Sequence, residues 1–275
     1  MKVIIGSGKV SSVIKDKQDV ILSHKEIEIT NLESIYKSLS KFPADTVVIN
    51  TAAKINLEWC ESNKQDSYLV NVVGANNVGT VCKDLGHHLV HVGSGCIFDG
   101  METEKIYTEE DVPTPASWYA TTKAEADQRL LSLNYKKITI IRPRQLISAV
   151  PYSTNMLTKF ISLGSGKFID SKNSITCIED MKYMIDHLIS RECYGVYNVA
   201  NIGWISPFQI AKSLKETIAP QLVVEKISYS DYIKNLGVKR VNTLLDISKL
   251  LSTGYVPQTA DSALNWCLEN YGKNT

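Results

Sequence analysis

The sequence has no excess of charge of either sign and no long apolar run. Its 275 residues include 30 basic and 29 acidic side chains, scattered along the chain, for a formal net charge of +1. Because nucleic-acid and membrane surfaces attract concentrated basic residues, we expect neither partner. No apolar run approaches the roughly 20 residues that span a bilayer, and the N-terminus lacks a signal-peptide pattern. These absences predict a cytoplasmic protein.

Cysteine is sparse and follows no ligand pattern. The six cysteines lie far apart, without a Cys-x-x-Cys pair or the spacing of a zinc site. We therefore expect no metal and, for most of these thiols, a buried reduced state. Internal repeats and low-complexity linkers are also missing. Since 44% of the residues are hydrophobic, the chain can bury a sizeable core, in one large domain or two modest ones.

Short apolar runs alternate with segments of helical composition. The runs typical of buried strands are 3–5, 19–22, 46–53, 89–92, 138–141 and 195–200, and helices are expected at about 61–85, 153–163, 207–217 and 262–271. This alternation predicts an α/β fold, a Rossmann-like doubly wound parallel sheet. We expect residues 1–145, which the turns described next indicate to be NADP-binding, to form one domain to which strand 195–200 returns. Residues 146–194 and 204–275 would form mainly a smaller, discontinuous substrate-binding part.

Two turns near the N-terminus have the composition of a dinucleotide site. The first, Gly6-Ser7-Gly8-Lys9-Val10, follows a strand, and its glycines would let backbone N–H groups approach a pyrophosphate. It departs from the usual motif because Ser11 stands where a third glycine is common. The second turn, Ser23-His24-Lys25, offers a hydroxyl, an imidazole and an ammonium where NAD-binding chains place an acid. It favours the 2′-phosphate of NADPH, the alternative being an ordinary solvated turn.

Small residues also end the strand at 46–53. Only small side chains would let the backbone of Ala52, Ala53 and Lys54 pass close to a dinucleotide. Asn71 falls on the long helix expected after this strand. It is either a buried polar residue satisfied by the backbone or, as the family resemblance described below implies, a residue that braces the active site.

Residues 87–123 include the candidate catalytic side chains. Its apolar run ends in Gly93-Ser94-Gly95-Cys96, and Tyr119 and Lys123 follow on a predicted helix, four residues apart and thus on one face. Ligands of open α/β sheets bind outside the carboxyl ends of the strands, where Ser94 and Cys96 would lie. A phenol titrates near ~10 and a neighbouring ammonium favours the phenolate. Tyr119 could therefore protonate a carbonyl oxygen that Ser94 orients.

Ser94, Tyr119 and Lys123 resemble the catalytic triad of the extended short-chain dehydrogenase/reductases, in particular the dTDP-4-dehydrorhamnose reductase branch. Further segments are similar to the bifunctional nucleotide-sugar 3,5-epimerase/4-reductases: Trp59-Cys60-Glu61-Ser62, Asn71-Val72-Val73-Gly74, Gly95-Cys96-Ile97-Phe98 and Arg142-Pro143-Arg144. The resemblance implies that a UDP- or dTDP-linked 4-keto-6-deoxyglucose is epimerised at C3 and C5. NADPH-dependent reduction at C4 would then give nucleotide-L-rhamnose, with Tyr119 and Lys123 also contacting the cofactor.

Within this resemblance, Cys96 and Lys159 match the acid–base pair of epimerisation. The alternatives are a small buried hydrophobe for Cys96 and a solvated surface residue for Lys159. Substrate contacts are expected from Ser94, Gly95, Cys96, Arg142, Arg144, Asn155 and Arg240. One of the two arginines at the strand end, Arg142 or Arg144, would usually form a structural ion pair instead of a substrate contact.

Two other functions stay open. One is a 4-ketoreductase that acts on a sugar already epimerised, with Cys96 as a packing residue. The other is a non-catalytic NADP-binding regulatory subunit. The resemblance also implies a separate 4,6-dehydratase as supplier of the substrate, and it allows a homodimer. The sequence does not distinguish UDP from dTDP as the carrier.

Overall fold

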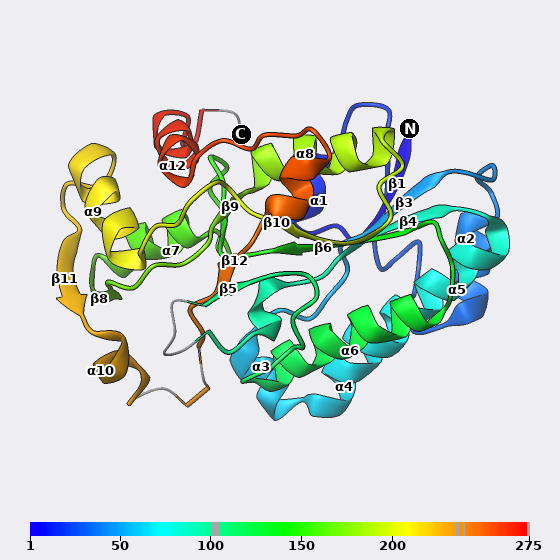
Figure 1. The fold of residues 1–275 in the computed structure, drawn as a ribbon, viewed down its shortest axis with the longest axis horizontal. Helices are drawn as coiled ribbons and strands as arrows, with labels where there is room; N and C mark the ends of the chain where they lie inside the picture. The colour runs from blue at the N-terminus through cyan, green and yellow to red at the C-terminus, as the bar shows by residue number, and fades with distance from the viewer. Residues whose placement is uncertain (101–104, 235–236, 239, 274–275) are drawn as a thin grey trace.

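The computed structural model describes residues 1–100, 105–234, 237–238 and 240–273, and its centre is a parallel sheet. Six strands pair in the order β10-β6-β4-β3-β1-β2. They are β1 (Lys2–Ile5), β2 (Val20–Leu22), β3 (Val47–Asn50), β4 (His88–Val92), β6 (Ile138–Pro143) and β10 (Gly195–Val199). Figure 1 shows helices on both faces of this sheet. The predicted α/β fold with a parallel central sheet is confirmed.

The strand order reverses direction at β1. Strand β2 pairs with one side of β1 and β3 with the other, both in parallel. Such a reversal opens a crevice outside the carboxyl ends of the strands, where ligands of open α/β sheets bind. The turns after β1, β3 and β4 therefore meet at one edge of the sheet.

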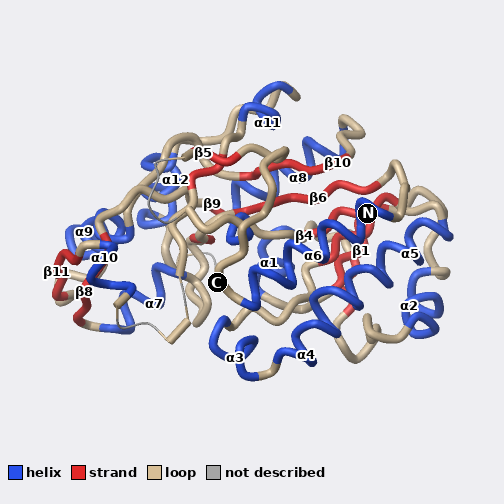
Figure 2. The backbone as a smooth tube through the Cα atoms, turned by 60° about the horizontal axis from the view of Figure 1, so that its bottom comes forward, coloured by secondary structure: helices blue, strands red, loops and turns tan. Residues whose placement is uncertain are grey.

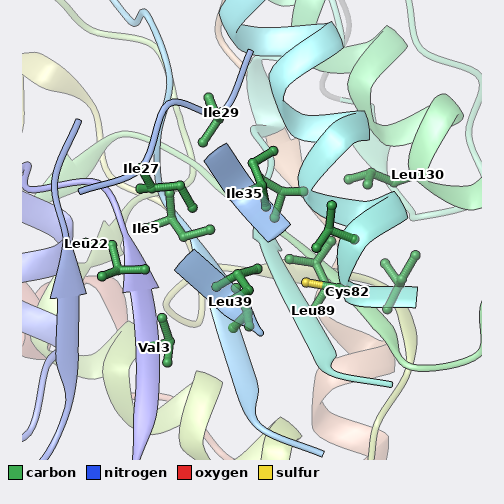
Figure 3. Close-up of a cluster of buried hydrophobic side chains, with 14 of the residues drawn as sticks. Val3, Ile5, Leu22, Ile27, Ile29, Ile35, Leu39, Cys82, Leu89 and Leu130 are labelled. Atoms are coloured by element: carbon green, nitrogen blue, oxygen red, sulfur yellow. The ribbon is translucent and has the colours of Figure 1, made fainter. Parts of the chain in front are cut away.

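One face of the sheet is covered by α2 (Leu32–Leu39), α5 (Ala75–Leu85) and α6 (Trp118–Ser132). Figure 3 shows their apolar side chains packed on those of the strands, and the labelled residues include Val3, Ile5, Ile35, Leu39, Leu89 and Leu130. Gly79 permits a close approach of α5 to α6, because a Cβ there would meet Leu130 Cδ2 at 2.4 Å. This packing fixes the position of α6 over β4.

The other face is covered by α1 (Lys9–Ile14), α8 (Ile178–Ser190) and α11 (Ser248–Ser252). Residues Met181 and Ile185 of α8 are buried in one cluster with Ile4 and Ile49 of the strands. The predicted division after residue 145 assigns α8 to the substrate-binding part. Its apolar face instead completes the core of the sheet, because the central strands are apolar on both faces.

A second core lies beside the sheet, at one end of the molecule in Figure 2. It is built by α7 (Met156–Leu163), α9 (Pro207–Thr217) and α12 (Ala260–Glu269). Two small parallel sheets accompany these helices, β8 (Ser165–Ile169) with β11 (Val223–Ile227) and β7 (Leu146–Ile147) with β9 (Thr176–Cys177). A third pair, β5 (Ile106–Tyr107) with β12 (Leu244–Leu245), and the short helix α10 (Tyr229–Ile233) complete the fold.

The single helix expected at 61–85 is divided. It consists of α3 (Leu57–Ser62), α4 (Lys64–Tyr68), the π-helical turn η1 (Leu69–Gly74) and α5. Asn63 separates α3 from α4 with φ −127° and ψ 59°, which is not a helical conformation. No helix within the described ranges combines the length and the apolarity needed to cross a membrane.

Candidate functional site

The structure brings Ser94, Tyr119 and Lys123 together at the carboxyl end of β4. Ser94 begins the one-turn helix η2 (Gly95–Ile97), and its Oγ accepts a hydrogen bond from the Cys96 amide at 3.1 Å. Tyr119 lies in the first turn of α6, with its hydroxyl in hydrogen-bonding reach of Ser94. The start of α6 is fixed by Ser117, whose side chain caps the helix by accepting from the Ala120 amide.

Lys123 is almost completely enclosed, with 2% of its surface exposed. Its Nζ donates to the carbonyl of Val92 at 2.8 Å and lies 3.4 Å from His91 Nε2. Burial lowers the pKa of Lys123 to about 8, although the nearby Asp127 carboxylate acts in the opposite direction. The Lys123 ammonium therefore holds its proton much less tightly than an exposed lysine, as suits a group that takes part in proton transfer.

Desolvation raises the pKa of the Tyr119 phenol, and the neighbouring Cys96 raises it further. The Ser94 hydroxyl and the Arg144 guanidinium lower it again, but they do not outweigh the burial. The sequence predicted that Lys123 would favour the phenolate. In the structure Arg144 is a cation that acts on Tyr119 in this direction. The phenol thus keeps its proton near neutrality and is available as an acid.

The turn after β1 has the geometry that the first motif predicts. Gly6 adopts φ +105°, and a Cβ there would meet Thr51 Oγ1 at 2.7 Å, so the turn requires glycine. Around Gly8 a Cβ would meet nothing within 4 Å, which leaves its backbone open to a ligand. Ser11, in place of the third glycine, pairs its hydroxyl with Thr51 Oγ1 at 2.7 Å. The serine that replaces the third glycine therefore has a hydrogen-bond partner for its hydroxyl and fits in α1.

The turn after β2 contains an acid that the sequence reasoning missed. His24 and Lys25 are exposed, as a phosphate contact requires. The carboxylate of Glu26 accepts hydrogen bonds from the Ser23 amide at 2.8 Å and from the Ser23 hydroxyl. Ser23 is thus engaged within the turn. Glu26 could have been found from the sequence, because it directly follows the Ser23-His24-Lys25 turn predicted to contact the 2′-phosphate.

Asn71 connects the loop after β3 to α6. It is 1% exposed, and its Oδ1 accepts from the Lys54 amide at 2.7 Å. Its Nδ2 donates to the Lys54 carbonyl and to Thr122 Oγ1, both at 3.0 Å. Asn71 is satisfied mainly by backbone, and through Thr122 it also fixes the helix that carries Lys123. Ala52 and Ala53 are half-buried in the same loop, and the Nζ of Lys54 lies 5.2 Å from the centroid of the Trp59 ring.

Arg144 is the cation in contact with Cys96. Its Nη1 donates to Cys96 Sγ at 3.2 Å, whereas Lys159, the predicted partner, occupies the exposed face of α7. The Cys96 side chain is partly exposed. Gly95, before it, packs so tightly that a Cβ would meet Leu245 Cδ1 at 2.8 Å.

The other predicted substrate contacts have different surroundings. Arg142 is 4% exposed and forms an ion pair with Asp127 at 2.9 Å, the structural fate expected of one strand-end arginine. Asn155 caps α7 and is 1% exposed, and its Nδ2 donates to two backbone carbonyls, so its polar atoms are engaged within the fold. Arg240 lies at the surface, where it pairs with Glu58 of α3 at 2.5 Å.

Most of the thiols are buried, as the sequence indicated. Cys60, Cys82, Cys177 and Cys267 are buried, and Cys193, like Cys96, is partly exposed. Cys177 and Cys267 lie 3.6 Å apart, Sγ to Sγ, and Cys177 also donates to the Glu179 carboxylate. In the described part of the chain these three side chains form a group that a metal ion could join. That the protein holds no metal stays a prediction.

The structure is thus a parallel α/β sheet with a serine, a tyrosine and a lysine at the end of one central strand. The chain belongs to the family described as the RmlD substrate binding domain, whose pattern matches residues 7–272.

Known proteins similar to the chain agree with this family. A bifunctional dTDP-4-dehydrorhamnose 3,5-epimerase/dTDP-4-dehydrorhamnose reductase of Arabidopsis thaliana is 28% identical over 202 residues, which are 71% of this chain and 66% of that protein. A dTDP-4-dehydrorhamnose reductase of Aggregatibacter actinomycetemcomitans is 25% identical, over 83% of this chain and 82% of the relative. The chain spans 36% or less of three trifunctional rhamnose-synthesis proteins of Arabidopsis thaliana that it also resembles.

A solved structure shares the fold over the whole length. The dTDP-4-dehydrorhamnose reductase of Bacillus anthracis, in complex with NADP, superimposes with a TM-score of 0.88 at 23% identity, and each chain is covered completely. At this level of identity the likeness shows the fold.

Proposed function

We propose that the chain is an NADPH-dependent reductase of the C4 ketone of a nucleotide-linked 4-keto-6-deoxyhexose, with a nucleotide-L-rhamnose as product. The observation that carries this proposal is the convergence of Ser94, Tyr119 and Lys123 at the carboxyl end of β4. The reductases among the relatives support the substrate class. The NADP complex of the structural neighbour supports the cofactor. A purely regulatory NADP-binding subunit would not need the complete Ser/Tyr/Lys group.

The turns at the sheet edge fit a dinucleotide. The open backbone at Gly8, together with Gly6, Ser7, Lys9 and Val10, would hold the pyrophosphate at the start of α1. His24 and Lys25 would meet the 2′-phosphate, and the half-buried Ala52 and Ala53 leave room beside β3. When bound, reduced nicotinamide supplies the hydride for the ketone carbon.

The residues of this chain supply the proton and the orientation. Ser94 would hydrogen-bond the C4 oxygen, and Tyr119 would give that oxygen its proton as it gains negative charge. Lys123 lies one turn further along α6 with a pKa of about 8, and in this proposal it would return the proton to Tyr119 at neutral pH. Asn71 holds α6 in place through Thr122.

A direct assay tests the reductase proposal. Purified protein is mixed with NADPH and either UDP- or dTDP-4-keto-6-deoxyglucose, and NADPH absorbance and product NMR are followed. Both the pre-epimerised and the unepimerised sugars are supplied. Consumption of NADPH with formation of a 6-deoxyhexose supports the proposal. Tight NADPH binding with no turnover of any of these sugars would instead indicate a regulatory subunit.

A second activity, 3,5-epimerisation, is favoured by Cys96 in the same turn as Ser94. Its thiol is partly exposed and faces a guanidinium, so it could remove a proton beside the ketone. The bifunctional plant relative supports this activity. Without NADPH, the protein in D₂O should then exchange the protons at C3 and C5 of the keto sugar. Cys96→Ala should lose this exchange while it retains C4 reduction.

The same proposal implies a partner. The 4-keto sugar must come from a separate 4,6-dehydratase, an activity that the trifunctional relatives carry in the same polypeptide. A homodimer is part of the proposal too, and sedimentation of the purified chain tests it.

A further inference from the structure

Arg144 is held in place on several sides. It lies just beyond the end of β6 and is 8% exposed. Its backbone amide donates to Thr176 Oγ1 at 3.0 Å, and its Nη2 donates to the carbonyl of Val241. Its Nη1 donates to Cys96 Sγ at 3.2 Å. The guanidinium is therefore directed at the thiol by contacts from two other segments of the chain.

Cys96 is fixed from the opposite side. Its amide is held by Ser94 Oγ, and the turn that carries it packs through Gly95 on Leu245 of β12. These contacts fix the backbone that carries the thiol, and the bond from Arg144 Nη1 orients the sulfur. Since Cys96 is partly exposed, a substrate can still reach it. The pair is thus both fixed and accessible.

We propose that Arg144 is the fixed positive charge that maintains Cys96 as a thiolate, and that this makes Cys96 the base of epimerisation. The inference rests on the proposed function. The Cys96 thiolate takes a proton from the carbon beside the C4 ketone, and the C–H electron pair moves into the carbonyl to form an enolate. The enolate carbon then receives a proton from an acid on the opposite face, for which Lys159 remains the predicted donor. The Cys96 thiol returns its proton to water.

An arginine suits this task because a guanidinium stays charged at every working pH. It can stabilise the thiolate without competing for the proton that the thiolate must take. A charge-assisted hydrogen bond is also directional, so it holds the sulfur in one orientation. Arg144 acts here through Cys96 and is a positioning residue.

The competing role for Arg144 is a contact to the substrate diphosphate, as the sequence predicted. In the structure two of the five guanidinium N–H groups are directed at Cys96 and Val241, and the buried Nε has no hydrogen-bond partner among the described residues. Arg240, another predicted substrate contact, lies at the surface and pairs with Glu58. The two roles differ in a measurable way, because only the first changes the reactivity of Cys96 in the absence of substrate.

The experiment measures alkylation of Cys96 by iodoacetamide, read from the Cys96 peptide by mass spectrometry. Wild type, Arg144→Met, Arg144→Lys and the control Arg240→Met are compared at pH 7 and pH 10. At pH 7 the Arg144→Met rate should fall at least ~10-fold, because a thiol without a cation is mostly protonated there. At pH 10 the thiol ionises unaided, so the variants should converge. Arg144→Lys should recover most of the rate, and Arg240→Met should match wild type.

Two results would overturn the inference. One is an Arg144→Met rate equal to that of wild type at pH 7. The other is a deficit that persists at pH 10, which would mean that the substitution only rearranged the turn. In the first case, a raised KM of Arg144→Met for the sugar nucleotide would return Arg144 to the diphosphate.

Proton exchange in D₂O separates this inference from the proposed function. If wild type exchanges the C3 and C5 protons, Arg144→Met should slow the exchange ~10-fold at pH 7. If wild type does not exchange them, epimerisation is refuted, and with it the assignment of Cys96 as the base. The alkylation rates still decide whether Arg144 maintains the thiolate.

Discussion

The candidate site has two ends that are built differently. At the end proposed to be catalytic, the catalytic end, Ser94 and Lys123 are 5% and 2% exposed, and their polar atoms are held by neighbours. At the end proposed to bind the dinucleotide, the cofactor end, His24 and Lys25 are exposed, and so is Gly8. At the first end burial itself tunes the chemistry, since desolvation shifts the pKa of Lys123 down and that of Tyr119 up.

The two ends differ in how strongly one charged side chain interacts with its neighbours. A buried charge interacts strongly with its neighbours because little water screens it, whereas exposed charges are screened within about 10 Å at ordinary salt. Substitutions at the catalytic end should therefore have large effects on rate and stability. Those at the cofactor end should have smaller effects that depend on salt.

The largest effect should follow from Tyr119→Phe. The ring keeps its packing and loses only the proton donor, so kcat for ketone reduction should fall by ~10²-fold or more. NADPH affinity should hardly change. Steady-state kinetics and a cofactor titration check both expectations. A variant that turned over at the wild-type rate would show that another group is the acid. Substitutions at the catalytic end would then not have the larger effects expected of them.

Lys123→Met should abolish reduction but stabilise the fold at pH 7. The pKa of Lys123 falls from its ordinary 10.5 to about 8 in the folded protein, which opposes folding by roughly 3 kcal/mol. The lost hydrogen bond to Val92 offsets about 1 kcal/mol of the gain.

The pH dependence has a definite sign. Below about pH 8 both states of wild type are protonated and the burial penalty is complete. Between about 8 and 10.5 the unfolded chain binds more protons, so wild-type stability rises with pH and the advantage of the variant shrinks. Urea unfolding at pH 7 and pH 10 measures this. A variant less stable than wild type at pH 7 would mean that packing of the lysine outweighs its charge.

The smallest effect is expected at the cofactor end. Lys25→Ala should weaken NADPH binding about tenfold and leave NADH unchanged, because only NADPH carries the 2′-phosphate. Glu26→Gln should strengthen NADPH binding a few-fold, since it removes a negative charge from the same turn. Titrations at low and high salt give the test. Equal affinity of wild type for both cofactors would refute the preference for NADPH.

The strands and the shared helix face of Tyr119 and Lys123 follow closely from the sequence. The apolar runs at 138–141 and 195–200 correspond to β6 and β10, and the helix expected at 207–217 is α9 (Pro207–Thr217). Pro207 and the capping Ser206 set that start locally. Tyr119 and Lys123 share a face because spacing along a helix is geometry, not tertiary context.

The sequence does not predict that Arg142 and Arg144 have different partners. Both lie at the end of the same predicted strand, and their spacing of two would place them on one face. The strand ends at Pro143, so Arg142 lies inside it and Arg144 just beyond it. Arg142 then meets Asp127 from α6, and Arg144 meets Cys96. These partners come from distant segments, and no local pattern encodes them. The short strands β5, β8, β11 and β12 were missed for the same reason.

The π-helical turn η1 (Leu69–Gly74) takes up one extra residue between α4 and α5. Each residue of an α-helix rotates the chain by about 100°, and a π turn accommodates one residue more than an α turn would. Asn71 lies inside this turn and binds Lys54 and Thr122, while α5 beyond it keeps Val78 and Val81 on the sheet. Deleting a single residue between 69 and 74 would close the π turn to an α turn and leave α5 in phase with the sheet. The side chain that such a deletion would displace is Asn71, so the extra residue serves the contacts to Lys54 and Thr122 and not the packing of α5.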